Sequence, residues 1–297
     1  MIYNMPEYWL MKKAEPIGSY LTFSSPSSFT LKTNNGAKNW DGTLEYSTDT
    51  TTWTTWDGTT ELAPSGNVLY LRGTGNTVIT GSNSDYKWIL TGSDIACSGN
   101  IETLLDYAAV QAGRHPTMAN YCYARMFYEC TNITTAPELP ATTLAESCYR
   151  SMFDGCTSLT TAPALPATTL ARACYNYMFY GCTSLITAPV LPATTLAPFC
   201  YSSMFFGCTS LTTVPALPAT TLPEYCYQGM FQNCTSIKLS STKTGEYTQA
   251  YRIPTSGNGV EEKGARNSIF SNTGGTFKGA PPINKTYYLS NTNTIVG

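Results

Sequence analysis

The stretch Cys148-Tyr-Arg-Ser-Met-Phe-Asp-Gly-Cys-Thr157 decides the fold of this chain, because its pattern recurs around it without insertions. The pattern is Cys-Tyr-x-x-Met-Phe-x-x-Cys-Thr. Its five copies begin at Cys122, Cys148, Cys174, Cys200 and Cys226, each 26 residues after the last. A constant period of this length means that every copy is one structural unit, stacked in register on its neighbour. We therefore predict a solenoid.

A longer repeated phrase carries a resemblance to a known family. Met-Phe-x-Gly-Cys-Thr-Ser-Leu, followed by Leu-Pro, begins at Met152, Met178 and Met204. It resembles the BspA-type leucine-rich repeat of bacterial surface proteins, whose usual phrase is closer to Ala-Phe-x-x-Cys-x-x-Leu. Methionine stands in this chain where that family has alanine. The match covers about residues 117–237, and it implies a right-handed leucine-rich-repeat-like solenoid.

The apolar spacing within one copy predicts a helix. Cys148, Met152 and Cys156 lie four residues apart, and Tyr149 and Phe153 follow the first two of them directly. If residues 145–154 are helical, these side chains form one continuous inward face. The Ala-Pro and Leu-Pro steps that follow supply no amide donor at proline, so a strand on the opposite wall should be brief or irregular.

Composition divides the chain into four parts. Residues 1–16 form a short arm rich in Tyr, Trp and Met. Residues 17–96 hold period-two runs such as Val68-Leu-Tyr-Leu71, separated by Asn-Gly and Asp-Gly, which predict an antiparallel β-sandwich. Residues 97–237 contain the repeats. Residues 238–297 begin as a polar, Gly-rich excursion and end in a degenerate repeat.

Both ends of the repeat block are expected to be capped. Apolar residues at positions 101, 104, 105 and 108 predict an amphipathic helix with Asn100 as its N-cap. Such a helix would cover the apolar edge of the first repeat, as terminal repeats must for solubility. At the other end, the segment from Ser268 to Thr273 echoes the segment from Ser151 to Cys156 with its cysteine lost.

Ten of the eleven cysteines lie in the repeats. Within one helical copy the two cysteines would be about 12 Å apart, whereas the Cα atoms of a disulfide lie within about 7 Å. Three interpretations remain: small buried thiols that fill a repeated pocket, disulfides between neighbouring copies, and a metal site. The metal site lacks a C-x-x-C pair, and His115 is the only histidine. We expect free structural thiols.

Composition and motifs also exclude several classes of protein. The chain has 297 residues, 12% of them charged, and a net charge of −2, whereas nucleic-acid binding needs clustered Lys and Arg. No apolar run is long enough for membrane insertion, and the amino terminus does not read as a secretory signal. With His115 alone and no nucleophile motif, we expect a protein without catalytic residues, cofactor or bound metal.

Internal comparison of the copies indicates a binding surface. Positions identical in every copy serve stacking, and positions that differ are free to face water or a partner. The aromatic residues at the variable positions suit contact with a protein or a glycan, although they would also cover apolar edges of the repeats. The predicted binding residues are Tyr128, Tyr177, Tyr180, Phe199, Phe206 and Tyr225.

Two functions fit this interpretation. The first is a bacteriophage or prophage virion component, of the tail-fibre or receptor-binding type, that contacts a bacterial surface. Its arm and β-domain would then contact other virion proteins, and the thiols and the missing signal favour assembly in a reducing cytoplasm. The second is a bacterial cell-surface adhesin of the BspA type that binds host proteins or glycans.

Overall fold

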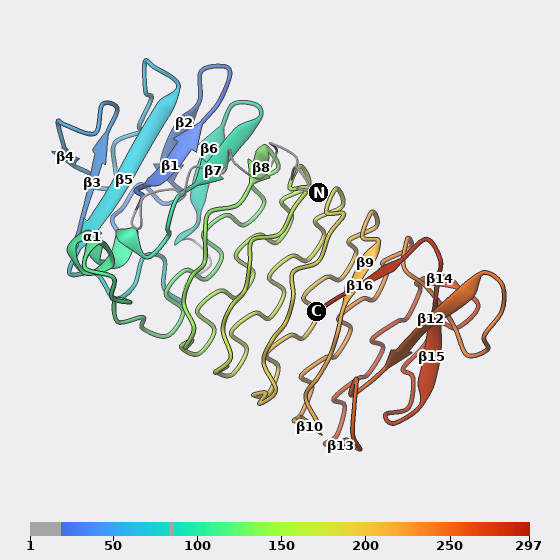
Figure 1. The fold of residues 1–297 in the computed structure, drawn as a ribbon. Coiled ribbons are helices and arrows are strands. Elements are labelled where there is room, and N and C mark those ends of the chain that lie inside the picture. The colour runs from blue at the N-terminus through green and yellow to red at the C-terminus, as the bar shows by residue number, and fades with distance from the viewer. Residues whose placement is uncertain (1–18, 83–85) are drawn as a thin grey trace, which may run out of the picture.

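The computed structural model describes residues 19–82 and 86–297, so the predicted arm over residues 1–16 lies outside the described residues. At the amino-terminal end lies a six-stranded sheet with the strand order β4-β3-β5-β1-β7-β8 (Figure 1). Its strands are β1 (Leu21–Ser24), β3 (Thr43–Ser47), β4 (Thr54–Thr55), β5 (Val68–Thr74), β7 (Ile95–Ser98) and β8 (Ile133–Thr135). Its last strand, β8, belongs to the first repeat and pairs with β7 in parallel.

A separate two-stranded sheet packs against this one. β2 (Thr30–Thr33) and β6 (Trp88–Thr91) pair antiparallel. The indole of Trp88 lies 5.5 Å from that of Trp56 and 6.4 Å from the ring of Phe23, measured between ring centroids. The period-two pattern of the sequence thus places alternate side chains in a core rich in aromatic residues. The run Thr77-Val-Ile-Thr80, although rich in β-branched residues, is irregular.

The one α-helix of the described residues, α1 (Thr103–Gln111), packs against β5. Gly73 permits this close approach, because a Cβ at that position would lie 1.7 Å from the carbonyl oxygen of Leu104. The N-cap residue is Glu102, and its amide donates to the side chain of Asn100 at 2.8 Å. Asn100, the predicted cap, therefore lies two residues before the actual cap and accepts a hydrogen bond from its amide.

Each repeat is a run of linked turns in which successive amides alternate between two acceptors. In the third repeat, the amide of Asn176 donates to the carbonyl three residues earlier, at 3.2 Å. The neighbouring amides of Tyr175 and Tyr177 donate instead to Cys200 and Ser202 of the fourth repeat, both at 3.0 Å. The same alternation runs through the other repeats. Hydrogen bonds within a repeat fix its turns, and hydrogen bonds between repeats hold the stack together.

One residue in four along this path has a left-handed backbone, with φ between 52° and 76°. These residues are Tyr121, Arg125 and Glu129, then Ser147, Ser151 and Gly155, then Ala173, Tyr177 and Gly181, then Phe199, Ser203 and Gly207, and last Tyr225, Gly229 and Asn233. A left-handed residue interrupts an α-helix, because helical residues need negative φ. The turns consequently repeat every four residues, which matches the spacing of the Cys, Met and Cys side chains.

The predicted fold class, an N-terminal all-β sandwich followed by a right-handed leucine-rich-repeat-like solenoid with terminal caps, is wrong. Residues 19–82 and 86–297 form several small sheets and one helix, no sheet is closed, and no regular leucine-rich-repeat solenoid is present. The helix expected over residues 145–154 is a run of turns. The physical reason is the spacing: apolar residues four apart drift by about 40° per step around an α-helix, whereas the four-residue turn keeps them aligned.

The opposite wall of the repeats has little regular structure, as its prolines lead one to expect. An isolated parallel bridge joins Thr161 to Thr187, and bridges of the same kind join Thr143 to Thr169 and Thr169 to Thr195. Further along, β9 (Thr213–Pro215) pairs in parallel with the C-terminal strand β16 (Thr294–Val296). Prolines supply no amide to a ladder, so extended segments lie side by side with few hydrogen bonds.

The carboxy-terminal end is closed by a four-stranded sheet with the order β12-β15-β11-β14, at the far end of the molecule from β5 (Figure 1). Its strands are β11 (Lys238–Ser240), β12 (Tyr247–Arg252), β14 (Gly274–Gly275) and β15 (Thr286–Ser290), and the short β10 (Thr221–Leu222) pairs with β13 (Val260–Glu261). Residues 264–272 add a sixth run of turns. The amides of Tyr227 and Phe231 donate to Ala265 and Ile269 in this run, at 2.8 and 2.9 Å.

Stacked rings fill the interior of the repeats. The tyrosines that follow the first cysteine of each copy are buried and nearly parallel, with neighbouring ring centroids 5.6 to 6.0 Å apart. The phenylalanines of the five copies form a second column, which Phe270 of the sixth run extends at 5.2 Å from Phe231. Each repeat buries its apolar face only by stacking on the next, which makes the invariant residues structural.

All eleven cysteines are buried and free, which confirms the expectation of structural thiols. The two thiols of a repeat differ in their surroundings. The Sγ of Cys182 donates to the carbonyl oxygen of Phe153 in the preceding repeat at 3.0 Å, and the equivalent thiols of Cys156 and Cys208 make the same bond. The Sγ of Cys174 has no such partner among the described residues. Burial raises the pKa of Cys174 to about 12, so this thiol stays protonated.

The left-handed positions can be tested at Gly207, where φ is 72° and a Cβ would meet no atom closer than 3.8 Å. Because the space is open, Gly207→Ala should cost only the backbone strain, about 1 kcal/mol of the free energy of unfolding. Thr209→Ala, on an exposed neighbour, should change it by less than about 0.5 kcal/mol. Urea unfolding measures both. Equal stability of the two variants would contradict the left-handed turn.

The two kinds of thiol give a matched pair of serine substitutions. Cys174→Ser places a buried hydroxyl without an acceptor and should cost roughly 1 to 3 kcal/mol of the free energy of unfolding. Cys182→Ser retains the Phe153 carbonyl as acceptor and should cost less. Chemical denaturation of both variants under reducing conditions makes the comparison. A greater loss for Cys182→Ser would show that the thiol contact to Phe153 is not reproduced by a hydroxyl.

Candidate binding surface

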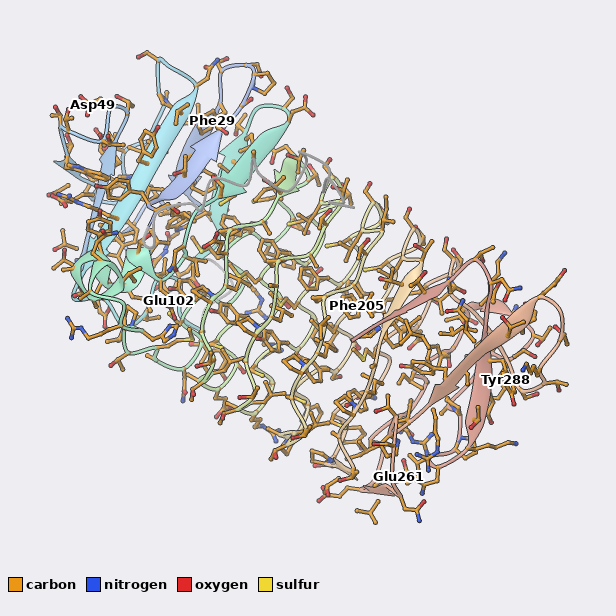
Figure 2. All side chains as sticks on the ribbon, in the orientation of Figure 1. Phe29, Asp49, Glu102, Phe205, Glu261 and Tyr288 are labelled. Atoms are coloured by element: carbon orange, nitrogen blue, oxygen red, sulfur yellow. The ribbon has the colours of Figure 1, made fainter. Side chains whose placement is uncertain are left out.

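The position six residues after the first cysteine is half-buried in all five repeats. We call these residues the outer row: Tyr128, Asp154, Tyr180, Phe206 and Gln232. The Cys-Tyr and Met-Phe pairs of each repeat are buried, and the outer-row residue follows the Met-Phe pair directly, where the path turns away from the core. Figure 2 labels Phe205, the buried residue directly before Phe206, which belongs to the column of stacked phenylalanines.

Three of the predicted binding residues form one cluster on the third and fourth repeats. The rings of Tyr180 and Phe206 stack with their centroids 4.5 Å apart and their planes 8° from parallel. Tyr177 lies 5.7 Å from Tyr180 with its ring tilted by 56°. All three are half-buried. Because the two stacked rings cover one face of each other, a partner would meet the parts of the three rings that remain exposed.

Phe199 and Tyr225 form a second pair that the fold itself uses. Their ring centroids lie 5.0 Å apart, and the guanidinium carbon of Arg172 lies 4.7 Å from the Phe199 ring centroid. Tyr225 also packs on the sixth run of turns, because a Cβ added at Gly264 would lie 2.2 Å from its ring. This pair therefore covers the backbone of the neighbouring run, as the edge-covering interpretation of the variable aromatic residues expects.

Tyr128 stands apart from both groups. The ammonium nitrogen of Lys87 lies 4.9 Å from its ring centroid, and the same nitrogen pairs with Glu129 at 2.8 Å. A cation over an aromatic face is favourable, so Lys87 occupies the face that a ligand would use. The structure thus divides the six predicted residues into a cluster of three, a packed pair and a covered single ring.

Asp154 is a member of the outer row that the sequence reasoning did not select. It lies between Tyr128 and Tyr180 in the row, on the second repeat. Desolvation raises the pKa of its carboxyl to about 6, with a smaller contribution from Glu129, while a hydrogen bond with Ser151 and the charge of Arg125 act in the opposite direction. The signal that identifies Asp154 is its position in the period, six residues after the first cysteine, whereas the predicted residues share an aromatic ring.

In residues 19–82 and 86–297, no group of three or more His, Cys, Asp or Glu side chains is placed to hold a metal ion. No helix of that part of the chain is long and apolar enough to cross a membrane. Comparisons with protein-family models, with curated proteins and with solved structures find no match to this chain.

The raised pKa of Asp154 predicts a dependence of stability on pH. The folded-state pKa of Asp154 is about 6, against 3.8 for the free group, so the folded chain binds this proton more tightly than the unfolded chain does. Protonation of Asp154 therefore stabilises the fold fully below about pH 4, and this stabilisation is lost as the pH rises through 6. Asp154→Asn should therefore be more stable than the native chain at pH 7, by about 1 kcal/mol after allowance for solvent screening, and equally stable near pH 4.

Asp57→Asn is the control of opposite sign. Hydrogen bonds from Thr59, first through its side chain, and from the Thr60 amide lower the pKa of the Asp57 carboxyl to about 2. Its carboxylate therefore stabilises the fold at neutral pH, and the asparagine variant should be the less stable one there. Denaturant unfolding at pH 4 and pH 7 measures both variants. A pH-independent difference for Asp154→Asn would contradict the desolvation of its carboxyl.

Proposed function

We propose that this chain is a non-enzymatic binding protein whose cluster of Tyr177, Tyr180 and Phe206 contacts a protein or glycan on a cell surface. The observation that carries the proposal is the contrast between the invariant and the variable aromatic residues of the repeats. Every invariant aromatic residue of the repeats is buried in a stack, whereas this cluster gathers three half-buried rings at positions that vary. Aromatic residues gathered on a weakly charged surface suit recognition.

The chemistry of the cysteines supports binding over catalysis. A thiol is a nucleophile only as a thiolate. Burial raises the pKa of these cysteines, for example of Cys130 to about 11 and of Cys226 to about 12. The two thiols of each repeat are buried and serve as small groups in its packing.

We place the protein in a bacteriophage or prophage virion, as a tail-fibre or receptor-binding component that contacts a bacterial surface. Eleven free thiols suit folding in a reducing cytoplasm, where virions assemble. On this proposal the N-terminal arm and the β-strands after it contact other virion proteins. The second candidate is a cell-surface adhesin that binds host proteins or glycans, and the BspA-like phrase from Met152 favours it.

The cluster is tested by replacing Tyr180 and Phe206 together with serine. Loss of the stacked pair should lower the free energy of unfolding by about 1 kcal/mol. Binding of the labelled chain to intact bacterial cells should weaken by more than 1.4 kcal/mol, about tenfold, if the rings form a hot spot. Flow cytometry measures the binding, with epithelial cells as the parallel target for the adhesin candidate.

The double variant Phe199→Ser with Tyr225→Ser is the matched control, because it removes a ring pair that packs on the sixth run of turns. This control should lose stability and keep its affinity for cells. Unchanged attachment of the Tyr180 and Phe206 variant, together with a stability loss equal to that of the control, would show that the cluster only covers the repeats.

A further inference from the structure

A pocket of about 310 Å³ opens beside the start of α1 and the first two repeats. Figure 2 labels Glu102 at this junction. The residues around the pocket come from three segments that are distant in sequence: Glu102, the stretch His115, Pro116 and Met118, and residues 141–145. None of them belongs to the outer row, so the pocket is separate from the proposed binding cluster.

Glu102 brings a buried carboxylate to this pocket. Its side chain is 3% exposed, and its two carboxylate oxygens lie 2.8 and 3.1 Å from Nδ1 of His115. No other partner of the carboxylate occurs among the described residues. One imidazole nitrogen fills only part of the roughly four acceptor sites of a carboxylate. A buried carboxylate with unfilled acceptor sites is costly unless further donors reach it.

The two members of the pair differ in exposure. The side chain of His115 is 53% exposed, against 3% for Glu102. The pocket therefore runs from a histidine that solvent reaches to a carboxylate that it does not. Desolvation raises the pKa of the Glu102 carboxyl, and the hydrogen bond and charge of His115 oppose this shift. A donor that carries a positive charge would satisfy the carboxylate better than water does.

The pocket is lined by both apolar and polar residues. Pro116, Met118 and Leu144 line it together with Ala141 and Ala145, and the hydroxyl-bearing residues are Thr142 and Thr143. A pocket that places apolar side chains beside a carboxylate matches a straight alkyl chain that ends in an ammonium group, because the methylenes can pack on Pro116, Met118 and Leu144 while the three N–H donors reach the oxygens. An anion would be repelled at the same place.

We propose that this pocket binds a primary alkylammonium group, the terminal part of a lysine side chain or of a free amine, with its nitrogen beside the Glu102 carboxylate and its methylenes against Pro116, Met118 and Leu144. The group takes over the position of the His115 imidazole, which turns toward solvent. This site adds a charge-selective contact to the chain and does not depend on the aromatic cluster.

Isothermal titration calorimetry of the full chain tests the proposal with three probes: butylammonium chloride, Nα-acetyl-lysine N-methylamide, and the norleucine analogue of that amide. The lysine amide should bind at least tenfold more tightly than the norleucine amide, which has the same stem without the charge. Stronger binding of the lysine amide than of butylammonium would assign the site to a protein side chain, and the reverse order to a free amine.

Two variants complete the test. Glu102→Gln keeps the shape of the side chain and removes its charge, so it should lose at least tenfold in affinity for the lysine amide. His115→Gln removes the competing imidazole and should bind the amide as tightly as the native chain or more tightly. Equal binding of the lysine and norleucine amides by the native chain, or no binding of either at millimolar concentration, would overturn the proposal. This comparison stands even if Glu102→Gln fails to fold.

Discussion

The hydrogen bond from every second amide of a repeat to a carbonyl of the next repeat is the interaction on which this structure depends. It fixes the alternation of acceptors, because the amides between must then find carbonyls three residues back in their own repeat. Turns closed in this way need a left-handed residue in every four, and the chain supplies one at each such position. Backbone amides paired in this pattern meet the need of a buried backbone for hydrogen-bond partners.

The same alternation explains the column formed by the second cysteine of each repeat. Carbonyls such as that of Phe153 accept an amide of their own repeat and also the Sγ of the next repeat, here Cys182 at 3.0 Å. A serine hydroxyl would have to reach the same oxygen from a Cβ–O bond that is shorter than the Cβ–S bond of cysteine. A cysteine in that column is therefore a donor as well as a filler, which accounts for its presence in all five copies.

The sequence predicted the stacking and the inward residues because both follow from a constant period, but it did not predict the conformation of one repeat. Apolar residues spaced by four fit an α-helix approximately and the four-residue turn well, so their spacing does not separate the two conformations. Only the polar residues between them distinguish the turn from the helix. Ser147, Ser151 and Gly155 occupy the left-handed positions of one copy, and serine at such positions gives a weak signal. The close packing of Gly73 on Leu104 likewise depends on tertiary contact.

The constant period also explains which part of the candidate surface can be predicted from the sequence. Tyr180 and Phe206 occupy one position in neighbouring copies, and a stack of repeats brings them together whatever the local conformation. Lys87 over Tyr128 and Gly264 against Tyr225 come from segments outside the period, so no counting within the repeats reveals them. Glu102 and His115 are thirteen residues apart in the chain and share a pocket only because α1 lies beside the first repeats.

The most direct test of this account is the through-hydrogen-bond scalar coupling between the amide nitrogen of Tyr175 and its acceptor carbonyl carbon, measured by NMR on the isotope-labelled chain. The stacked turns predict a coupling to Cys200, one repeat further on, whose carbonyl accepts this amide at 3.0 Å. A coupling to Ala171, four residues earlier, would be that of an α-helix and would contradict the account.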